Sequence, residues 1–149
     1  MLPFTKNDAL KQLKNGRLTV SVWPNELVSD KELMLTIVSQ YKYAFEYCSK
    51  HLRNDYDVAM AAVKFSADTF RFASERLRAN KQLAMIAVQK DYTMYEFIDN
   101  SLKNDDEIIS AAAKNSPFIF FMLKNNQITK NIMINAAKEN ALALSFVPE

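Results

Sequence analysis

Cysteine, glycine and histidine are almost absent from this 149-residue sequence, which contains one of each. The single cysteine, Cys48, excludes an intramolecular disulfide and suits a reducing compartment. The single glycine, Gly16, nearly excludes glycine-rich phosphate loops and hairpin-rich β folds, because both depend on positive φ angles. One histidine and one cysteine do not make a zinc site. These absences leave few of the side-chain sets that support catalysis or metal binding.

Long apolar runs and a strong charge of one sign are also lacking. No run approaches the roughly 20 apolar residues of a transmembrane helix, and the first residues lack the features of a signal peptide. The formal net charge is +2, with 49% hydrophobic and 24% charged residues, which is ordinary for a globular chain. We therefore expect a single cytoplasmic domain over residues 1–149, with no cofactor, no metal and no membrane contact.

The sequence contains an internal repeat. Equivalent residues recur 25 positions apart, and the clearest pairs are Val63 and Val88, Phe70 and Tyr95, Phe72 and Phe97, and Leu77 and Leu102. A period of roughly 20–50 residues is typical of proteins built from stacked structural repeats. The period places one potential helix-capping residue at the start of each unit: Thr5, Asp30, Asp55, Asn80, Asp105 and, after a step of 24, Thr129.

Each unit also has a regular apolar pattern after its capping residue. With positions counted from that residue, apolar side chains fall at +3, +4, +7 and +8, which predicts the buried face of an amphipathic helix of about ten residues. After a break, we expect a second helix with core residues at +15, +17 and +18. A leucine at +22 ends the first four units.

The pattern predicts a pair of short antiparallel helices in each unit. Helices this short are marginal alone in water, so neighbouring units must stack to cover their apolar faces. The predicted fold is all-α: an α-solenoid of helical hairpins with about 25 residues per repeat, five full units and a partial sixth. Because Phe146 to Glu149 carry no polar capping helix, a homodimer through the exposed C-terminal repeat is also expected.

Two stretches resemble a known repeat: residues 52–64 (Leu-Arg-Asn-Asp-Tyr-Asp-Val-Ala-Met-Ala-Ala-Val-Lys) and residues 70–78 (Phe-Arg-Phe-Ala-Ser-Glu-Arg-Leu-Arg). The repeat is that of the family catalogued as domain of unknown function 4116, and residues 102–114 are similar to it as well. The resemblance covers about two thirds of the chain. It implies an all-helical repeat found in multi-repeat proteins of bacteria, protists and large viruses. It implies no activity and no catalytic residues.

Two sets of side chains are candidates for binding. Five aromatic residues lie off the repeat pattern, so packing does not require them: Tyr41, Tyr43, Tyr92, Phe118 and Phe121. The apolar stretch 118–123 is either covered by the last unit or is a docking patch. The basic set recurs at two positions of the repeat: Lys14, Lys64, Lys114 and Lys138 at +9, and Arg53, Arg78 and Lys103 at +23. A cation at +9 also suits the helix dipole, which is the structural alternative to binding.

The repeat and the lack of catalytic chemistry favour a non-enzymatic module that binds another protein. We expect the binding residues to be the five off-pattern aromatic residues and three basic ones: Phe118, Phe121, Tyr41, Tyr43, Tyr92, Arg53, Arg78 and Lys103. If a pathogen or virus encodes it, such a small chain would act as an effector or inhibitor of a larger enzyme in the host cytosol.

Two rival functions come from other classes. The first is a nucleic-acid-associated repeat that uses the basic residues as one edge, although the sequence pI of 8.6 is below the value of about 9 that is usual for nucleic-acid binding. The second is an enzyme built on Cys48 and His51. Because +18 is a core position in the other units, Cys48 is better interpreted as a buried structural residue.

Overall fold

The computed structural model describes residues 3–139 and 141–146, and its regular elements in these ranges are all helices. The expectation of an all-α chain is thereby confirmed. Within the same ranges, every helix is too short or too polar to span a lipid bilayer. The chain divides into two compact units, Met1–Ser74 and Glu75–Glu149.

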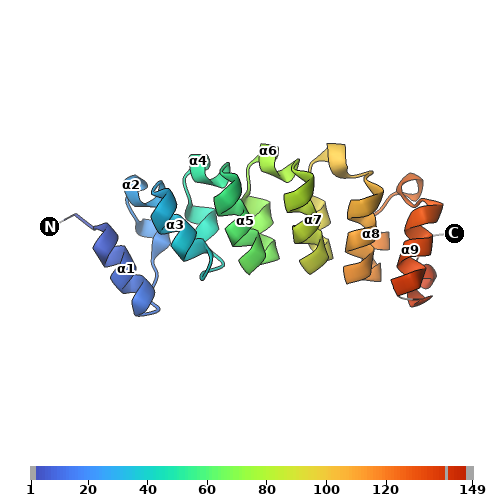
Figure 1. Cartoon of the computed structure of the whole chain (residues 1–149), viewed down its shortest axis with the longest axis horizontal. Coiled ribbons are helices and arrows are strands. Elements are labelled where there is room, and N and C mark those ends of the chain that lie inside the picture. Colours follow the sequence, from blue (N-terminus) through green and yellow to red (C-terminus); the bar gives the residue numbers. More distant parts are fainter. Residues whose placement is uncertain (1–2, 140, 147–149) are drawn as a thin grey trace. The chain divides into compact units, whose positions relative to one another are not determined.

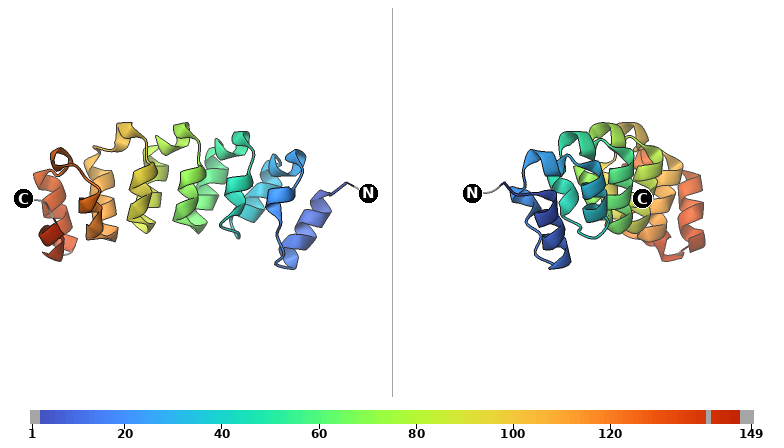
Figure 2. Two further views of the ribbon diagram at one scale, coloured as in Figure 1. Left: turned by 180° about the vertical axis from the view of Figure 1, so that it is seen from behind. Right: turned by 60° about the vertical axis from the view of Figure 1, so that its left-hand side comes forward.

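The first unit alternates long α-helices with short helical segments (Figure 1). The long helices are α1 (Lys6–Lys14), α3 (Lys31–Val38) and α5 (Tyr56–Phe65). The short segments are the 3-10 helices η1 (Val20–Val22), η2 (Ala44–Tyr47) and η3 (Ala67–Phe72), and the helices α2 (Asn25–Val28) and α4 (Lys50–Arg53). Helices α3 and α5 pack side by side, and α2 and α4 lie at the end where these long helices begin (Figures 1 and 2).

The second unit repeats this order of elements, starting from α6 (Glu75–Arg78). Its long helices are α7 (Lys81–Lys90), α8 (Asp106–Asn115) and α9 (Lys130–Glu139). Its 3-10 helices are η4 (Tyr92–Phe97), η5 (Asn100–Leu102), η6 (Pro117–Phe121), η7 (Asn125–Gln127) and η8 (Ala141–Phe146). Helix α8 packs between α7 and α9 (Figure 1). In the period, η5 and η7 take the place of α2, α4 and α6.

The predicted capping residues stand directly before the long helices of both units: Thr5, Asp30, Asp55, Asn80, Asp105 and Thr129. Asp30 accepts a hydrogen bond from the backbone N–H of Leu33 at 2.9 Å, and Asn80 accepts one from Leu83 at 3.0 Å. These bonds satisfy backbone donors that have no partner inside the helix. The helix starts therefore follow from the local sequence.

The predicted buried face of the long helices is also confirmed. In α3, α5, α7 and α8, the side chains at +3, +4, +7 and +8 are at most 3% exposed. Val63, Val88 and Ala113 occupy the same position in three successive periods, and each is buried. The alanines at +7 present little side-chain volume, which suits the close packing of neighbouring long helices.

The prediction for the second half of the period is wrong in two respects. First, one helix was expected, but a 3-10 helix is followed by a separate short helical segment that carries the +22 side chain. Second, +17 does not belong to the core: Val22 is 76% exposed, Tyr47 42% and Met122 37%. A 3-10 helix has about three residues per turn, so +15 and +18 share the inward face and +17 does not. Position +14 completes this core, as in Thr69 at 1% exposure.

Candidate functional site

The long helices within each unit are linked by lysines at +1. Lys6 bonds to Asp30 and Glu32 of the following period, at 2.9 Å and 3.1 Å. Lys31 and Lys81 make the equivalent pairs one and three periods later, all between 2.8 Å and 2.9 Å. The hydrogen bonds that the Lys31 ammonium donates to Asp55 and Asp57 raise the pKa of Lys31. The acidic residues at the helix starts therefore cap helices and pair with lysines.

The backbone makes a second kind of link between periods. The N–H at +19 donates to the C=O at +23 of the preceding period at three junctions: Ser49 to Val28 (2.9 Å), Ser74 to Arg53 (3.0 Å) and Asp99 to Arg78 (3.1 Å). Such bonds satisfy the last C=O groups of the short helices, which have no partner inside them. The same pair of positions recurs once more, at Lys103 and Lys124.

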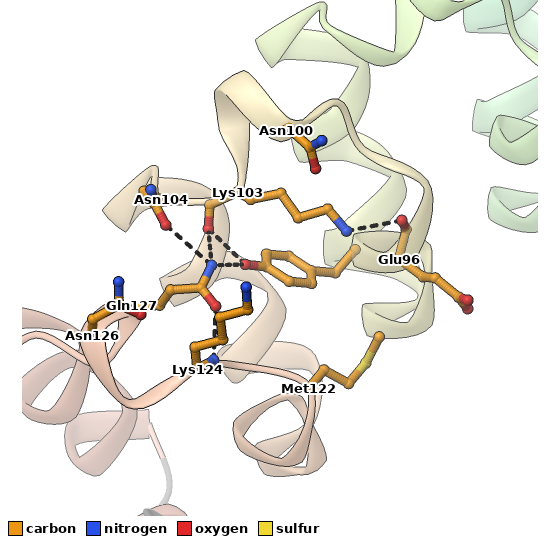
Figure 3. Close-up of a pocket in the computed structure, with 9 residues that line it drawn as sticks. Glu96, Asn100, Lys103, Asn104, Met122, Lys124, Asn126 and Gln127 are labelled. Carbon is orange, nitrogen blue, oxygen red and sulfur yellow. Dashed lines mark hydrogen bonds between the residues drawn. The ribbon is translucent and has the colours of Figure 1, made fainter.

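At the junction of Lys103 and Lys124, a side-chain amide stands in the place of the direct backbone bond (Figure 3). The backbone N–H of Lys124 donates to Gln127 Oε1 at 2.7 Å, and Gln127 Nε2 donates to the C=O of Lys103 at 2.8 Å. The Tyr95 hydroxyl donates to the same C=O at 2.6 Å and lies 2.9 Å from Gln127 Nε2. Gln127 is thus inserted between the two backbone groups.

Gln127 and Tyr95 are linked departures from the repeat. Gln127 occupies +22, where the earlier periods have leucine, and Tyr95 occupies +15, where the neighbouring periods have Phe70 and Phe120. Both side chains are buried, at 9% and 2% exposure. Because a buried polar group without a partner is costly, each of the two polar replacements gains by supplying a partner for the other. The sequence carries this signal, as two breaks in an otherwise apolar pattern, but sequence reasoning did not use it.

A pocket of about 570 Å³ opens beside this amide (Figure 3), and its lining residues are Tyr95, Glu96, Asn100, Lys103, Asn104, Met122, Lys124, Asn126 and Gln127. The Lys103 ammonium donates to the C=O of Glu96 at 2.9 Å and lies 5.1 Å from the centre of the Tyr95 ring. Partial burial lowers the pKa of Lys103. The Glu96 carboxylate points away from that ammonium (Figure 3). Of the predicted binding residues, only Lys103 lines this pocket.

Phe118 and Phe121 form an exposed cluster with Phe146, here called the phenylalanine cluster. Phe118 is 50% exposed and Phe121 70% exposed. Their rings stack with centres 6.2 Å apart, and Phe146 meets them edge-on at 5.3 Å and 5.7 Å. Within the apolar stretch 118–123, the last period therefore touches Phe118 and Phe121 without covering them, whereas Ile119, Phe120 and Leu123 are buried. The residues after Phe146, which also belong to the expected dimer surface, lie outside the described residues.

The three predicted tyrosines differ in their surroundings. Tyr43 is 66% exposed, and the Lys42 ammonium lies 5.1 Å from the centre of its ring. Tyr41 is half-buried, and its hydroxyl donates to the C=O of Leu13 at 3.3 Å. Tyr92 is also half-buried. Of the five off-pattern aromatics, Phe118 and Phe121 are the pair whose rings stack on each other.

The basic residues lie in two separate places. In the first unit Arg53 precedes α5, whereas Lys64 lies in its last turn; Lys103 and Lys114 stand in the same relation to α8. A helix of ten residues is about 15 Å long, so +23 and +9 lie at its opposite ends. Lys14 and Lys138 also lie near helix ends. The Nε atoms of Arg53 and Arg78 are buried and have no hydrogen-bond partner. The basic positions do not form one edge.

Cys48 and His51 have different environments. Cys48 is 3% exposed, with its Sγ 3.8 Å from the C=O of Ala44, whereas His51 is exposed. Burial raises the pKa of the Cys48 thiol to about 12. Since cysteine nucleophiles act as thiolates, this thiol is not prepared for attack. Within the described ranges, His, Cys, Asp and Glu side chains do not gather in groups of three that would hold a metal ion.

Comparison with known proteins identifies a family. A model described as a domain of unknown function, DUF4116, matches residues 30–78 and 80–127. The matched segments begin at the capping residues Asp30 and Asn80, and each holds two periods of the repeat. No curated protein matches the chain, and no solved structure does. Because the two segments cover more than half of its residues, the chain belongs to the DUF4116 family.

Proposed function

We propose that this chain is a non-enzymatic α-solenoid of about 25 residues per repeat that binds another protein through its phenylalanine cluster. Recurring caps, buried faces and lysine pairs at a constant spacing support the repeat architecture. In such an array the core side chains serve packing, so function is expected from surface residues that depart from the pattern. The observation that carries the proposal is the exposure of Phe118 and Phe121.

The fold itself does not require phenylalanine at these two positions. Phe118 and Phe121 stand at +13 and +16, where the third period has Asp68 and Arg71 and the fourth has Thr93 and Glu96. Polar residues are therefore compatible with the same 3-10 helix. Large aromatic side chains are enriched among the residues that dominate binding energy at protein interfaces. The partner is expected to present an apolar anchor that packs on these rings.

The base of the cluster is buried and held by a local hydrogen bond. Ile119 and Phe120, which lie between the two exposed phenylalanines on η6, are 0% exposed. The Ser116 hydroxyl accepts a hydrogen bond from the backbone N–H of Phe118 at 3.4 Å, and Pro117 begins the helix. Presenting the rings on an ordered segment lowers the entropy lost on association. These features favour a preformed docking surface.

Affinity capture from the native cell tests the proposal. The tagged chain is compared with a Phe118→Ser and Phe121→Ser double variant and with Val22→Ser, which removes another exposed apolar side chain. Proteins captured by the unchanged chain and by Val22→Ser are expected to be lost from the double variant. Circular dichroism checks that all three are folded. Equal capture by the three chains would contradict the proposal.

The alternative, a nucleic-acid-associated repeat, has less support because its basic residues lie at opposite ends of the long helices. Binding to random DNA and RNA at increasing salt distinguishes the two functions. A steep fall of affinity with salt, as expected when lysines and arginines neutralise phosphates, would favour the alternative. Absence of binding near physiological salt would favour the protein-binding module.

A further inference from the structure

We propose that the pocket between η4, η5 and η7 binds an acidic side chain of a protein partner, carried on an extended peptide segment. The inference rests on the proposed protein-binding function and names the chemistry of a second contact. It is based on the pocket's lining, on the charge of its neighbours and on the replaced junction beside it (Figure 3).

The charge of the pocket is the first argument. The corresponding pocket at the preceding junction, about 210 Å³, contains Arg78 together with the carboxylates of Glu75 and Asp99. At +19, Asp99 is followed one period later by Lys124, so the next pocket has two lysines. The carboxylate of Glu96, which also lines that pocket, points away from Lys103. The Lys103–Lys124 pocket thus has two cations and one carboxylate, whereas its neighbour has one cation and two carboxylates.

The remaining capacity of Lys103 is the second argument. An ammonium has three N–H donors, and Lys103 directs one of them to the C=O of Glu96. The ammonium lies 5.1 Å from the centre of the Tyr95 ring, and its partial burial removes some of its water. Charges that are partly shielded from water interact more strongly than fully exposed ones. A carboxylate is the group that this ammonium would attract.

The amides of the pocket indicate that the ligand is a peptide. Asn100, Asn104 and Asn126 also line it, and a carboxamide both donates and accepts hydrogen bonds, as a peptide group does. Small-molecule pockets are mostly apolar and enclose most of their ligand. Seven of the nine residues here carry an amide, ammonium or carboxylate group. Such a lining suits one charged side chain with its neighbouring backbone.

Gln127 prepares the site before binding. It bonds to the backbone N–H of Lys124 and to the C=O of Lys103, so the two lysines stand on either side of one buried amide. The direct bond between these groups, as at the other junctions, would bring the two backbones together. Holding them apart leaves room beside the amide. The replacement of leucine by glutamine at +22 thus goes with a larger pocket, about 570 Å³ against about 210 Å³ at the preceding junction.

A peptide array tests the inference. Random nonapeptides with a central pair of Glu, Gln or Lys residues are probed with the labelled full-length chain. The variants are Lys124→Glu, Lys103→Met, which removes the ammonium and keeps an unbranched side chain, and Lys138→Glu as a control with the same charge change as Lys124→Glu. Lys124 and Lys138 are both exposed, so neither substitution is expected to disturb folding.

Glu-centred peptides are expected to bind more strongly than Gln-centred ones. Lys124→Glu should weaken that binding by about tenfold or more, as expected for loss of a charge-assisted hydrogen bond, and Lys103→Met should weaken it similarly. Lys138→Glu should leave it unchanged. Equal binding of Glu- and Gln-centred peptides, or equal effects of Lys124→Glu and Lys138→Glu, would overturn the inference. So would displacement of the peptide by equimolar inorganic phosphate or by a random oligonucleotide.

Failure of this inference is distinguishable from failure of the proposed function. If capture depends on Phe118 and Phe121 while the array shows no preference for Glu, the proposed protein-binding function stands and the inference of an acidic contact is rejected. If the array shows the Lys124-dependent preference while capture ignores the phenylalanine cluster, the docking surface of the proposed function is the part that fails.

Discussion

The junction of Arg53 and Ser74 in the first unit and that of Lys103 and Lys124 in the second occupy the same places in the 25-residue period. In the first, the backbone groups bond directly at 3.0 Å, over a core of phenylalanine and leucine. In the second, Gln127 lies between them, and the core contains a tyrosine hydroxyl. The two junctions meet the same backbone requirement by different means.

The difference teaches how a repeat gains a site without losing its fold. A direct bond satisfies two backbone groups but leaves no space between them. A carboxamide offers one donor group and one acceptor, so it satisfies the same two groups at a greater separation. The cost is that a polar side chain is buried, and Tyr95, Asn104 and the Lys103 carbonyl supply its partners. The first two predictions below test this comparison, and two more extend it to the helix caps and to the phenylalanine cluster.

The largest effect is expected at the apolar junctions. Leu77→Ala removes a side chain that is 0% exposed and leaves a cavity, so the free energy of unfolding should fall by about 2–5 kcal/mol. Gln127→Ala, at the same position of the period, should cost about 1–3 kcal/mol, chiefly through unsatisfied polar groups. Urea denaturation measures both. A larger loss for Gln127→Ala than for Leu77→Ala would show that the polar side chain at +22 contributes more to stability than the apolar one.

The next effect is the coupling between Tyr95 and Gln127. Tyr95→Phe and Gln127→Leu should each cost about 1–2 kcal/mol, because each leaves a buried polar group with fewer partners. The double variant restores the residues of the other periods and should cost less than the sum of the singles by at least about 0.5 kcal/mol. A double-mutant cycle by urea denaturation measures this coupling. Strict additivity would show that the two replacements are independent.

A smaller effect concerns the charged caps, which differ between Asp30 in the first unit and Asn80 in the second. Hydrogen bonds from the backbone N–H of Leu33 and from Lys6 lower the pKa of Asp30. Its folded pKa is thus below the unfolded value of about 3.9, so its contribution is complete above that value and is lost as the pH falls through the folded pKa. Acid weakens this cap and leaves Asn80 unaffected.

Asp30→Asn keeps a capping oxygen and removes this titration. Between about pH 4 and pH 2, its urea midpoint should fall less than that of the unchanged chain. Asn80→Asp is the reciprocal control, and its midpoint should fall more. Parallel curves for Asp30→Asn and the unchanged chain over this range would show that the folded pKa of Asp30 is not lowered.

The smallest effect on stability is expected at the phenylalanine cluster. Phe121→Ser changes a side chain that is 70% exposed, so the free energy of unfolding should change by about 0.5–1 kcal/mol at most. Its neighbour Phe120, at 0% exposure, provides the contrast: Phe120→Ala should cost about 3–5 kcal/mol. Thermal and urea unfolding compare the two. Similar losses would mean that Phe121 is part of the core.

Much of the helical framework could be predicted from the sequence. The caps and the buried face of the long helices were identified because both depend on residues within a few positions of one another. The second half of the period was predicted less well. Tyr47 and Met122 are large apolar residues at a regular spacing, which suggested a core position. Their exposure follows from the 3-10 conformation, which apolar spacing alone did not reveal.

The residues of the candidate sites also fall into those that the sequence identified and those that it did not. Phe118 and Phe121 were found because they break the pattern of a single period. Lys103 was found for its charge, but its partners were not: Gln127 and Lys124 belong to the next period, more than 20 residues away. The basic residues at +9 and +23 were expected to share an edge, because the period alone does not show at which end of a helix each lies.

The sequence by itself determined that this protein is helical, where its long helices begin and which of their faces is buried, because capping and periodicity are local properties. Only the tertiary structure decided that Gln127 joins Lys103 to Lys124 and that a pocket opens beside it. Whether two backbone groups bond directly or through a side chain depends on the packing of both periods at once. Residues of one period alone do not contain that information.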